Sequence, residues 1–248
     1  EATDNGRAGH ITVLDAATNT VQSDIMLPPN QNGFPNLLAA IALIGNQAWV
    51  PYERAAPDLP NELTTTLFAA VSTLDLASNV EDENAYLPLN DQTIFGSPVN
   101  NPIAVVPAPD GQRLYIVLAG SDLIEVIDIT KPAQPHLLKF LQVGLNPRGM
   151  ALSLDGKIGY VQNYLARSVT VLDLAALTTI KTITTTHETL SPQVLRGKQL
   201  FNNATNPQLS QGGWITCASC HPDGGTDSVT WMFPDGPRQS PPLWNAGQ

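Results

Sequence analysis

Alternating apolar and polar positions recur along the first three quarters of the chain. The segment 168–174, SVTVLDL, alternates as a β-strand with one buried face does. Residues 102–129 and 147–174 align without a gap at a spacing of 45 residues. In both copies an Asp-Gly step, at Asp110 and Asp155, separates two β-rich runs, which is typical of a tight hairpin turn. The pattern therefore predicts antiparallel strands joined by short turns.

The strand signature that ends in aspartate occurs four times, at Asp15, Asp75, Asp128 and Asp173. The two longer intervals contain insertions, 51–62, which is rich in proline, and 77–98. We expect both insertions to be loops. The second holds the acidic cluster Glu81, Asp82 and Glu83, which we expect to be solvated because runs of like charge usually face water.

Four strands in about 45 residues are the sequence signature of a β-propeller blade. A β-sandwich is the structural alternative, but sandwiches do not repeat at this period. Residues 9–27 supply the last two strands of one blade, and about three full blades follow. The predicted fold class is therefore mainly β, with a partial propeller of about 3.5 four-stranded blades over residues 1–187. Since propellers have about four to eight blades, we expect another chain or a missing segment to complete it.

The repeat pattern, with its PDG turn, its YV strand and its VxVLD strand, resembles the YVTN-type repeats of bacterial and archaeal surface proteins. The resemblance covers about residues 8–186 and is clearest in the last two repeats. It implies a propeller of about seven blades, so the chain reads as a fragment of a longer one.

The pattern changes after residue 187. Residues 191–201 predict a helix in which Ser191 is the N-cap and Pro192 occupies the first helical position. Further on, Cys217-Ala218-Ser219-Cys220-His221 forms a C-x-x-C-H motif. We expect residues 188–248 to form a small, mostly α, incomplete cytochrome c-like segment.

C-x-x-C-H is the motif that attaches haem c. Two thiols add to the two vinyl groups of haem, and the following histidine binds the iron axially. The alternatives are a thiol redox pair, which usually follows a βαβ pattern that this chain lacks, and a zinc site, which needs two more ligands. A structural disulfide this tight would be strained. We therefore expect one covalent haem c, held by Cys217, Cys220 and His221.

The flanking residues LSPQVLRGKQLF, WITCASCHPDGGTD and TWMFPDGPRQSPPL resemble the N-terminal haem domain of the di-haem cytochrome c peroxidase family, including its methylamine-utilisation type. The resemblance covers about residues 188–244. It implies that Arg238 contacts a haem propionate, with a solvent-facing arginine as the alternative. It also suggests that Trp231 and Phe233 lie on the ring edge, although ordinary core packing is equally compatible with the sequence.

The sixth iron ligand distinguishes an electron carrier from an enzyme, because a peroxide-reacting haem must open that position. Met232 is the only methionine after His221, and His187 lies upstream of the motif. Met232 is the candidate ligand, with His187 as the alternative. A second C-x-x-C-H motif, which a di-haem enzyme requires, is absent from this sequence.

Composition narrows the choice of partners. The chain has 248 residues and a formal net charge of −10. An acidic chain is a poor match for nucleic acid, since phosphate contacts need clustered lysine and arginine. No apolar run approaches the roughly 18 residues of a membrane span. Because haem is attached to such motifs outside the cytoplasm, we expect a periplasmic or cell-surface protein that meets a redox protein partner.

Three functions remain open from the sequence. The first is an exported c-type cytochrome in which a propeller supports electron transfer through haem c. The second is a di-haem peroxidase-like oxidoreductase that acts on H2O2 or on a protein partner. The third is a surface binding or scaffold module. The sequence does not decide whether the chain is an enzyme.

Overall fold

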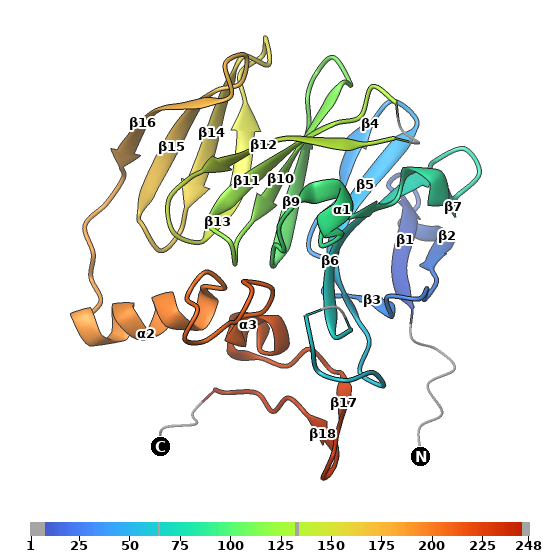
Figure 1. Ribbon diagram of the computed structural model, residues 1–248. Coiled ribbons are helices and arrows are strands. Elements are labelled where there is room, and N and C mark those ends of the chain that lie inside the picture. Colours follow the sequence, from blue (N-terminus) through green and yellow to red (C-terminus); the bar gives the residue numbers. More distant parts are fainter. Residues whose placement is uncertain (1–7, 64, 132–133, 245–248) are drawn as a thin grey trace.

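A computed structural model describes residues 8–63, 65–131 and 134–244. Its four-stranded antiparallel sheets stand side by side and are crossed at one end by the helices of the C-terminal segment (Figure 1). The fold is mainly β with propeller-type blades, which confirms the predicted fold class. The expected domain ranges also include residues 1–7 and 245–248, which lie outside the described residues.

The first strands form a hairpin of β1 (Gly9–Asp15) and β2 (Thr20–Leu27). The next sheet has the order β3-β5-β6-β7, while β4 also pairs with β5 and β8 with β6. Its strands are β3 (Phe34–Asn36), β4 (Ala42–Ile44), β5 (Gln47–Ala55), β6 (Leu67–Asp75), β7 (Val80–Glu81) and β8 (Leu87–Pro88). The short helices η1 (Glu83–Ala85) and α1 (Gln92–Phe95) follow in the second insertion.

Two regular blades come next, and they correspond to the 45-residue repeat. The first contains β9 (Pro102–Pro107), β10 (Arg113–Leu118), β11 (Leu123–Asp128) and β12 (His136–Gln142). The second contains β13 (Pro147–Leu152), β14 (Ile158–Asn163), β15 (Ser168–Asp173) and β16 (Thr178–Thr184). Gly111 and Gly156 both adopt φ +69° in the turn between the first two strands of their blades, as the Asp-Gly pattern predicted.

The four aspartate markers each end a strand that a turn follows, namely β1, β6, β11 and β15. There the carboxylate accepts hydrogen bonds from backbone N–H groups of the turn that follows, for example from Ala17 and Thr18 at Asp15 and from Ala175 and Ala176 at Asp173. Such Asx-type turns satisfy donors that the strand pairing leaves free. The repeated aspartate is therefore a turn-forming residue.

Apolar clusters fill the space between neighbouring blades. Tyr115, Ile124 and Val126 of one blade pack with Val161 and Leu172 of the next. A similar cluster that includes Trp49, Phe95 and Ile116 lies between the second sheet and the blade of β9–β12, and a third joins the β1–β2 hairpin to the second sheet. The blades are thus held together face to face.

The expectation that 51–62 is a loop is wrong for its first five residues, since Pro51 lies inside β5. On one side of β5, β4 pairs with residues 47–49 and β3 pairs with residues 53–55, so Pro51 lies opposite the gap between them. Its carbonyl, which points into that gap, accepts a hydrogen bond from Ala39 N. Proline has no N–H to donate, but no neighbouring strand among the described residues accepts a hydrogen bond from position 51 on this side. The strand therefore tolerates Pro51.

The expectation that the acidic cluster is solvated is wrong for Glu81. Its side chain is 9% exposed, accepts a hydrogen bond from Ser72 Oγ, and lies 3.8 Å from the buried guanidinium of Arg54. Burying a carboxylate costs free energy unless a partner charge or hydrogen bonds compensate it. Glu81 is therefore a structural anion of the second sheet.

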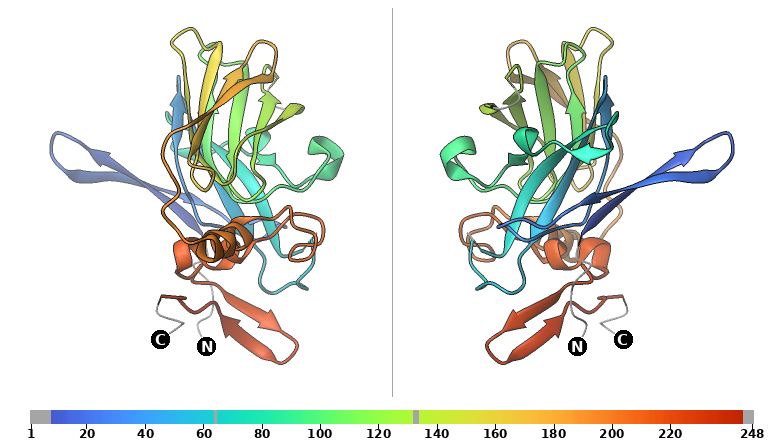
Figure 2. Two further views of the ribbon diagram at one scale, coloured as in Figure 1. Left: turned by 90° about the vertical axis from the view of Figure 1, so that its left-hand side faces the viewer. Right: turned by 90° about the vertical axis from the view of Figure 1, so that its right-hand side faces the viewer.

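The C-terminal segment begins with α2 (Pro192–Asn202), whose N-cap is Ser191, as predicted. It continues with α3 (Cys217–Cys220), η2 (Pro222–Gly224) and a hairpin of β17 (Thr230–Phe233) and β18 (Gly236–Gln239) that the sequence analysis did not predict. Two further views show α2 and α3 beneath the ends of the blades, with the β17–β18 hairpin below them (Figure 2). No helix among the described residues is long and apolar enough to cross a membrane.

Candidate functional site

The C-x-x-C-H motif forms one capped helical turn, α3. Thr216 Oγ1 accepts the backbone N–H of Ser219, and Ser219 Oγ accepts the backbone N–H of Thr216, both at 3.1 Å. This reciprocal capping box stabilises a turn that would be too short to persist by itself. Cys217 and Cys220 are the first and last residues of the turn, and side chains three positions apart lie on the same side of a helix.

The opposite side of this turn faces the blades. Ala218 and Ser219 are both buried, whereas Cys217 is exposed and Cys220 is partly buried. The turn therefore exposes the Cys217 thiol, while Cys220, on the same side of the turn, packs against an apolar cluster that includes residues of the second sheet.

The ring of His221 is oriented by the loop that follows it. His221 Nδ1 lies 3.2 Å from the carbonyl oxygen of Gly225, and the His221 backbone N–H bonds to Cys217 O at 3.0 Å. Histidines that bind metals usually donate their second ring N–H to a carbonyl or carboxylate, which fixes the tautomer. With Nδ1 engaged in this way, Nε2 is the nitrogen available to an iron atom.

Cys220 has an apolar environment. It packs at the edge of a cluster formed by Trp214, Val229 and Trp231 with residues of the second sheet. Burial, and secondarily the carboxylate of Asp227, raises the pKa of its thiol to about 12. A thiol that stays protonated at neutral pH is a poor nucleophile for disulfide exchange. Cys220 is therefore the buried and less reactive member of the pair, and Cys217 is the exposed one.

A buried polar link joins the back of α3 to the blades. The side-chain amide of Asn100 donates to Ser219 Oγ at 2.9 Å, to Trp214 O at 3.1 Å and to Glu53 Oε1 at 3.1 Å. Glu53 is 2% exposed, and burial raises its pKa to about 8. The sequence analysis missed both residues, because Glu53 lies in the segment expected to be a loop and a single asparagine carries no signal.

A second link of the same kind lies one blade further on. Asp122 accepts the backbone N–H of Asn146 at 2.6 Å and the side-chain amide of Asn203 at 3.0 Å. Burial raises the pKa of Asp122 to about 6. Nearby, the backbone N–H of Ala204 donates to Gly120 O at 2.8 Å. The segment that follows α2 is thereby fixed to the turn between β10 and β11.

The residues that were expected to surround the haem differ from one another in burial. Trp231 is buried in the cluster with Cys220, and its Nε1–H donates to Asp227 Oδ2 at 2.8 Å. Arg238 pairs directly across the hairpin with Trp231, forms an ion pair with Asp235 and is solvent-exposed. Directly opposed residues share a face of a hairpin, so Arg238 lies on the side that faces Cys220.

Met232 and Phe233 are exposed, with 46% of Met232 accessible to solvent. Because side chains alternate along a strand, Met232 points away from the face that Trp231 occupies. His187 is exposed in the connection between β16 and α2. The structure therefore brings Cys220 and Trp231 together in one cluster, leaves Arg238 exposed beside Asp235, and places Met232 on the other face of its hairpin.

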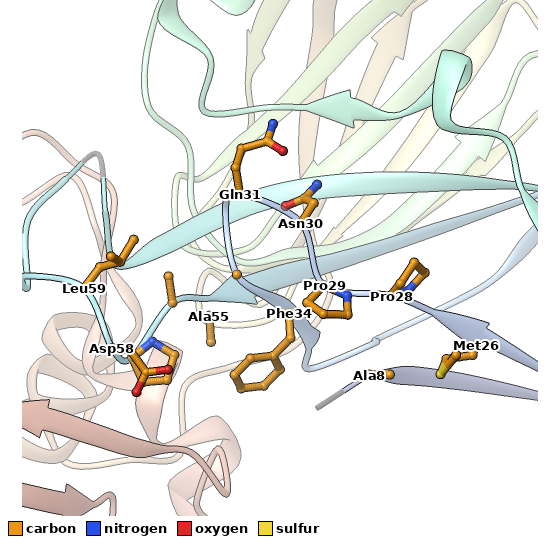
Figure 3. Close-up of a pocket in the computed structure, with 13 residues that line it drawn as sticks. Ala8, Met26, Pro28, Pro29, Asn30, Gln31, Phe34, Ala55, Asp58 and Leu59 are labelled. Atoms are coloured by element: carbon orange, nitrogen blue, oxygen red, sulfur yellow. The ribbon is translucent and has the colours of Figure 1, made fainter. Parts of the chain in front are cut away.

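A cavity of about 630 Å³ opens beside the same cluster. Figure 3 shows Met26, Pro28 and Pro29 on one side of it and Asp58 and Leu59 on the other. Phe34 and Ala55 line the cavity and also pack in the cluster that contains Cys220. The cavity is mostly apolar and adjoins the candidate site. Within the described ranges, no three His, Cys, Asp or Glu side chains gather where they could hold a metal ion.

Comparisons with known proteins concern mainly the blades. The family model for the cytochrome D1 heme domain matches residues 94–201, from within α1 to near the end of α2. Hydrazine synthase subunit beta of Kuenenia stuttgartiensis is 28% identical over 112 residues, which cover 37% of this chain and 28% of that protein.

Among solved structures, one supports the propeller-type fold. A structure of Kuenenia stuttgartiensis hydrazine synthase aligns with a TM-score of 0.59 at 21% identity, covering 70% of this chain and 54% of the other. A putative 6-phosphogluconolactonase from Bacteroides uniformis aligns with a TM-score of 0.45 at 18% identity, covering 71% and 50%. The chain thus spans about half or less of the length of these relatives. The family match ends before Cys217, and the comparisons together identify the blades as similar to haem-related proteins of the β-propeller type.

Proposed function

We propose that this chain is a c-type haem protein in which propeller blades hold a covalently attached haem for electron transfer. The observation that carries the proposal is the capped turn of α3, which presents Cys217 and Cys220 on one side and leaves His221 Nε2 available. Similarity to a haem-domain family supports a haem-related role for the blades.

In this proposal, residues of the chain anchor the haem, bind its iron, exclude water and neutralise charge. Cys217 and Cys220 anchor the group as thioethers, and His221 is the axial ligand whose orientation Gly225 O maintains. Trp231 and the apolar cluster would exclude water from one edge, and Arg238, which pairs with Asp235 in this structure, would neutralise a propionate. A bound haem c supplies reversible one-electron transfer, with a potential that depends on the surrounding charge and burial.

The proposal includes a location and two kinds of partner. Attachment of haem to C-x-x-C-H requires export, so the proposed compartment is the periplasm or the cell surface. The acidic chain suits a cationic redox protein, which its charge would steer at low ionic strength. Since the chain covers 54% of a structural relative, we propose that further blades, from this protein or another chain, complete the propeller.

Haem attachment can be tested directly. We expect the protein, expressed in a periplasm with haem-attachment machinery, to show one haem c per chain by intact mass and by its pyridine haemochrome spectrum. Replacement of either anchor, Cys217→Ser or Cys220→Ser, should leave a single thioether and shift the haemochrome band. An Ala218→Ser variant, which changes the same turn but no anchor, should keep the wild-type spectrum. A fully exported protein without haem would contradict the proposal.

The same protein distinguishes electron transfer from peroxidase-like chemistry. A six-coordinate low-spin spectrum without peroxide turnover supports the electron carrier, whereas a five-coordinate high-spin spectrum with turnover supports the enzyme. If Met232 is the sixth ligand, Met232→Leu will convert the low-spin spectrum to a high-spin one. Its exposed position on β17 leads us to expect no change.

A further inference from the structure

The buried link between α3 and the second sheet contains more acceptors than its hydrogen bonds use. Glu53 Oε1 accepts both the Asn100 amide at 3.1 Å and the backbone N–H of Asn101 at 2.5 Å. The other carboxyl oxygen, Oε2, is buried and has no hydrogen-bond partner among the described residues. An unpaired buried carboxyl oxygen is costly when it carries charge and much less so when it is protonated. The arrangement therefore suits a neutral Glu53.

This carboxyl acts on the haem-attachment turn through one side chain. The side-chain NH2 of Asn100 donates to Glu53, and it also donates to Ser219 Oγ and Trp214 O. Ser219 lies between the two cysteines, and its hydroxyl also caps α3. Ser219 directly precedes Cys220, so two hydrogen bonds connect the carboxyl to the residue next to the second anchor.

We propose that Glu53 is a positioning residue of the haem site, which fixes α3 through Asn100 and couples the iron's redox state to its own protonation. The proposal rests on the proposed function, since it needs a haem at Cys217 and Cys220. When an external one-electron acceptor takes the electron, the added positive charge favours the Glu53 carboxylate, and Glu53 releases a proton to solvent. On reduction both steps reverse.

The other ionisable groups near this link either cannot titrate once haem is attached or have hydrogen-bond partners other than Asn100. Cys220 cannot titrate once it has become a thioether. Asp227 is bonded to Trp231 Nε1 and to the backbone N–H of Val229. Asp122 lies on the turn whose Ser121 hydroxyl accepts the Asn100 N–H, but its own partners are Asn146 and Asn203. On β5 itself, Arg54 is bonded to Tyr52 and to carbonyl groups of the β2–β3 connection.

The burial of Glu53 sets the pH at which coupling appears. Burial raises its pKa to about 8, so the carboxyl is neutral at pH 6 and ionised well above pH 8. An ionised Glu53 stabilises the ferric state by attraction across a medium of low dielectric constant. The midpoint potential should therefore fall as pH rises through about 8.

Asp122 supplies a matched control within the chain. It accepts the backbone N–H of Asn146 as Glu53 accepts that of Asn101, one blade apart, but its other partner is Asn203 and not the attachment turn. The variants Glu53→Gln and Asp122→Asn each remove one buried acid and keep an acceptor oxygen. They differ in whether the acid is linked to α3.

The test is a redox titration of the haem-loaded protein between about pH 6 and about pH 10. We expect the wild-type potential to fall across this range, the Glu53→Gln potential to stay near the wild-type value at low pH, and Asp122→Asn to behave as wild type. A wild-type potential that does not change with pH overturns the proposal, and that measurement needs no variant. A fall retained in Glu53→Gln, or abolished equally by Asp122→Asn, also overturns it. Absence of haem from the wild-type protein would instead contradict the proposed function.

Discussion

At the scale of single residues, buried carboxyl groups are the features that most directly determine how this protein responds to pH. Glu125, in β11, is completely buried, and neither of its oxygens has a hydrogen-bond partner among the described residues. Burial raises its pKa to about 8 from an ordinary value near 4.5. Because the folded state holds the proton more tightly, Glu125 destabilises the folded state least below about pH 4.5. Its cost to the free energy of unfolding grows as pH rises from there to about 8, where the buried carboxyl ionises.

A substitution at Glu125 tests this account. We expect Glu125→Met, which has a similar size and no charge, to raise the free energy of unfolding by roughly 1–3 kcal/mol at pH 8 and by much less at pH 5. Urea unfolding of the wild-type protein and the variant at the two pH values measures both changes in the free energy of unfolding. Glu62→Gln, at an exposed glutamate, is the control and should change neither value. An equal gain at both pH values would show that ionisation of Glu125 is not the cause.

At the scale of elements, the β17–β18 hairpin depends on one side chain. Trp231 is buried in the cluster that joins the hairpin to Ala55 and Leu67 of the second sheet, while Phe233 of the same strand is exposed. Truncating a buried aromatic residue costs about 3–5 kcal/mol, and truncating an exposed one costs little.

We therefore expect Trp231→Ala to release the segment after α2 and to expose it to protease. Phe233→Ala, two positions along the same strand, should leave cleavage unchanged. Limited proteolysis followed by intact mass locates the cuts. If Trp231→Ala is cut no faster than wild type, other contacts, such as Met232 N with Pro57 O, are sufficient to hold the hairpin.

The elements also show what could be predicted from the sequence. The repeat, its turns and the helix after Ser191 follow from local patterns, because period-2 alternation, Asp-Gly turns and an N-cap each depend on a few adjacent residues. Pro51 and Glu81 could not be placed in this way. A proline is tolerated in β5 only because β3 and β4 leave a gap there, and Glu81 is buried only because Arg54 lies opposite. Both facts depend on residues distant in sequence.

In the candidate site, too, residues of a local sequence motif were predicted, and residues that depend on long-range contacts were not. The prediction for Cys217, Cys220 and His221 rests on a contiguous motif whose chemistry dictates each residue type. The Glu53–Asn100 link joins residues 47 positions apart to a turn more than 100 positions further on. No local pattern records such a contact.

At the scale of the whole molecule, the outer face of the last blade lacks the cover that the preceding blade has. Tyr115 and Tyr160 occupy the same position in the 45-residue repeat, yet Tyr115 is 2% exposed and Tyr160 is 46% exposed. Tyr115 packs against Val161 and Leu172 of the next blade. The difference indicates what a further blade would bury.

If a further blade covers Tyr160, a charge at this position should become destabilising. In the chain described here, Tyr115→Lys should cost several kcal/mol of folding free energy, because it buries a charge, whereas Tyr160→Lys should cost less than about 1 kcal/mol. In a protein or complex that contains the completing blades, both substitutions should be similarly destabilising. Thermal unfolding of both forms provides the comparison. Equal tolerance of Tyr160→Lys in the two forms would contradict blade completion at this face.

The contacts beneath the blades also have a consequence for the order of folding. Each blade closes through neighbours in sequence, but the C-terminal segment bonds to residues far upstream, with Asn36 reaching Asp227 O across 191 positions. Local hairpins form faster than contacts that close long loops. We therefore expect the blades to fold before α3 docks beneath them. In that interval Cys220 lies outside its apolar cluster, so the proposed attachment of haem would meet both thiols on a turn that has not yet docked.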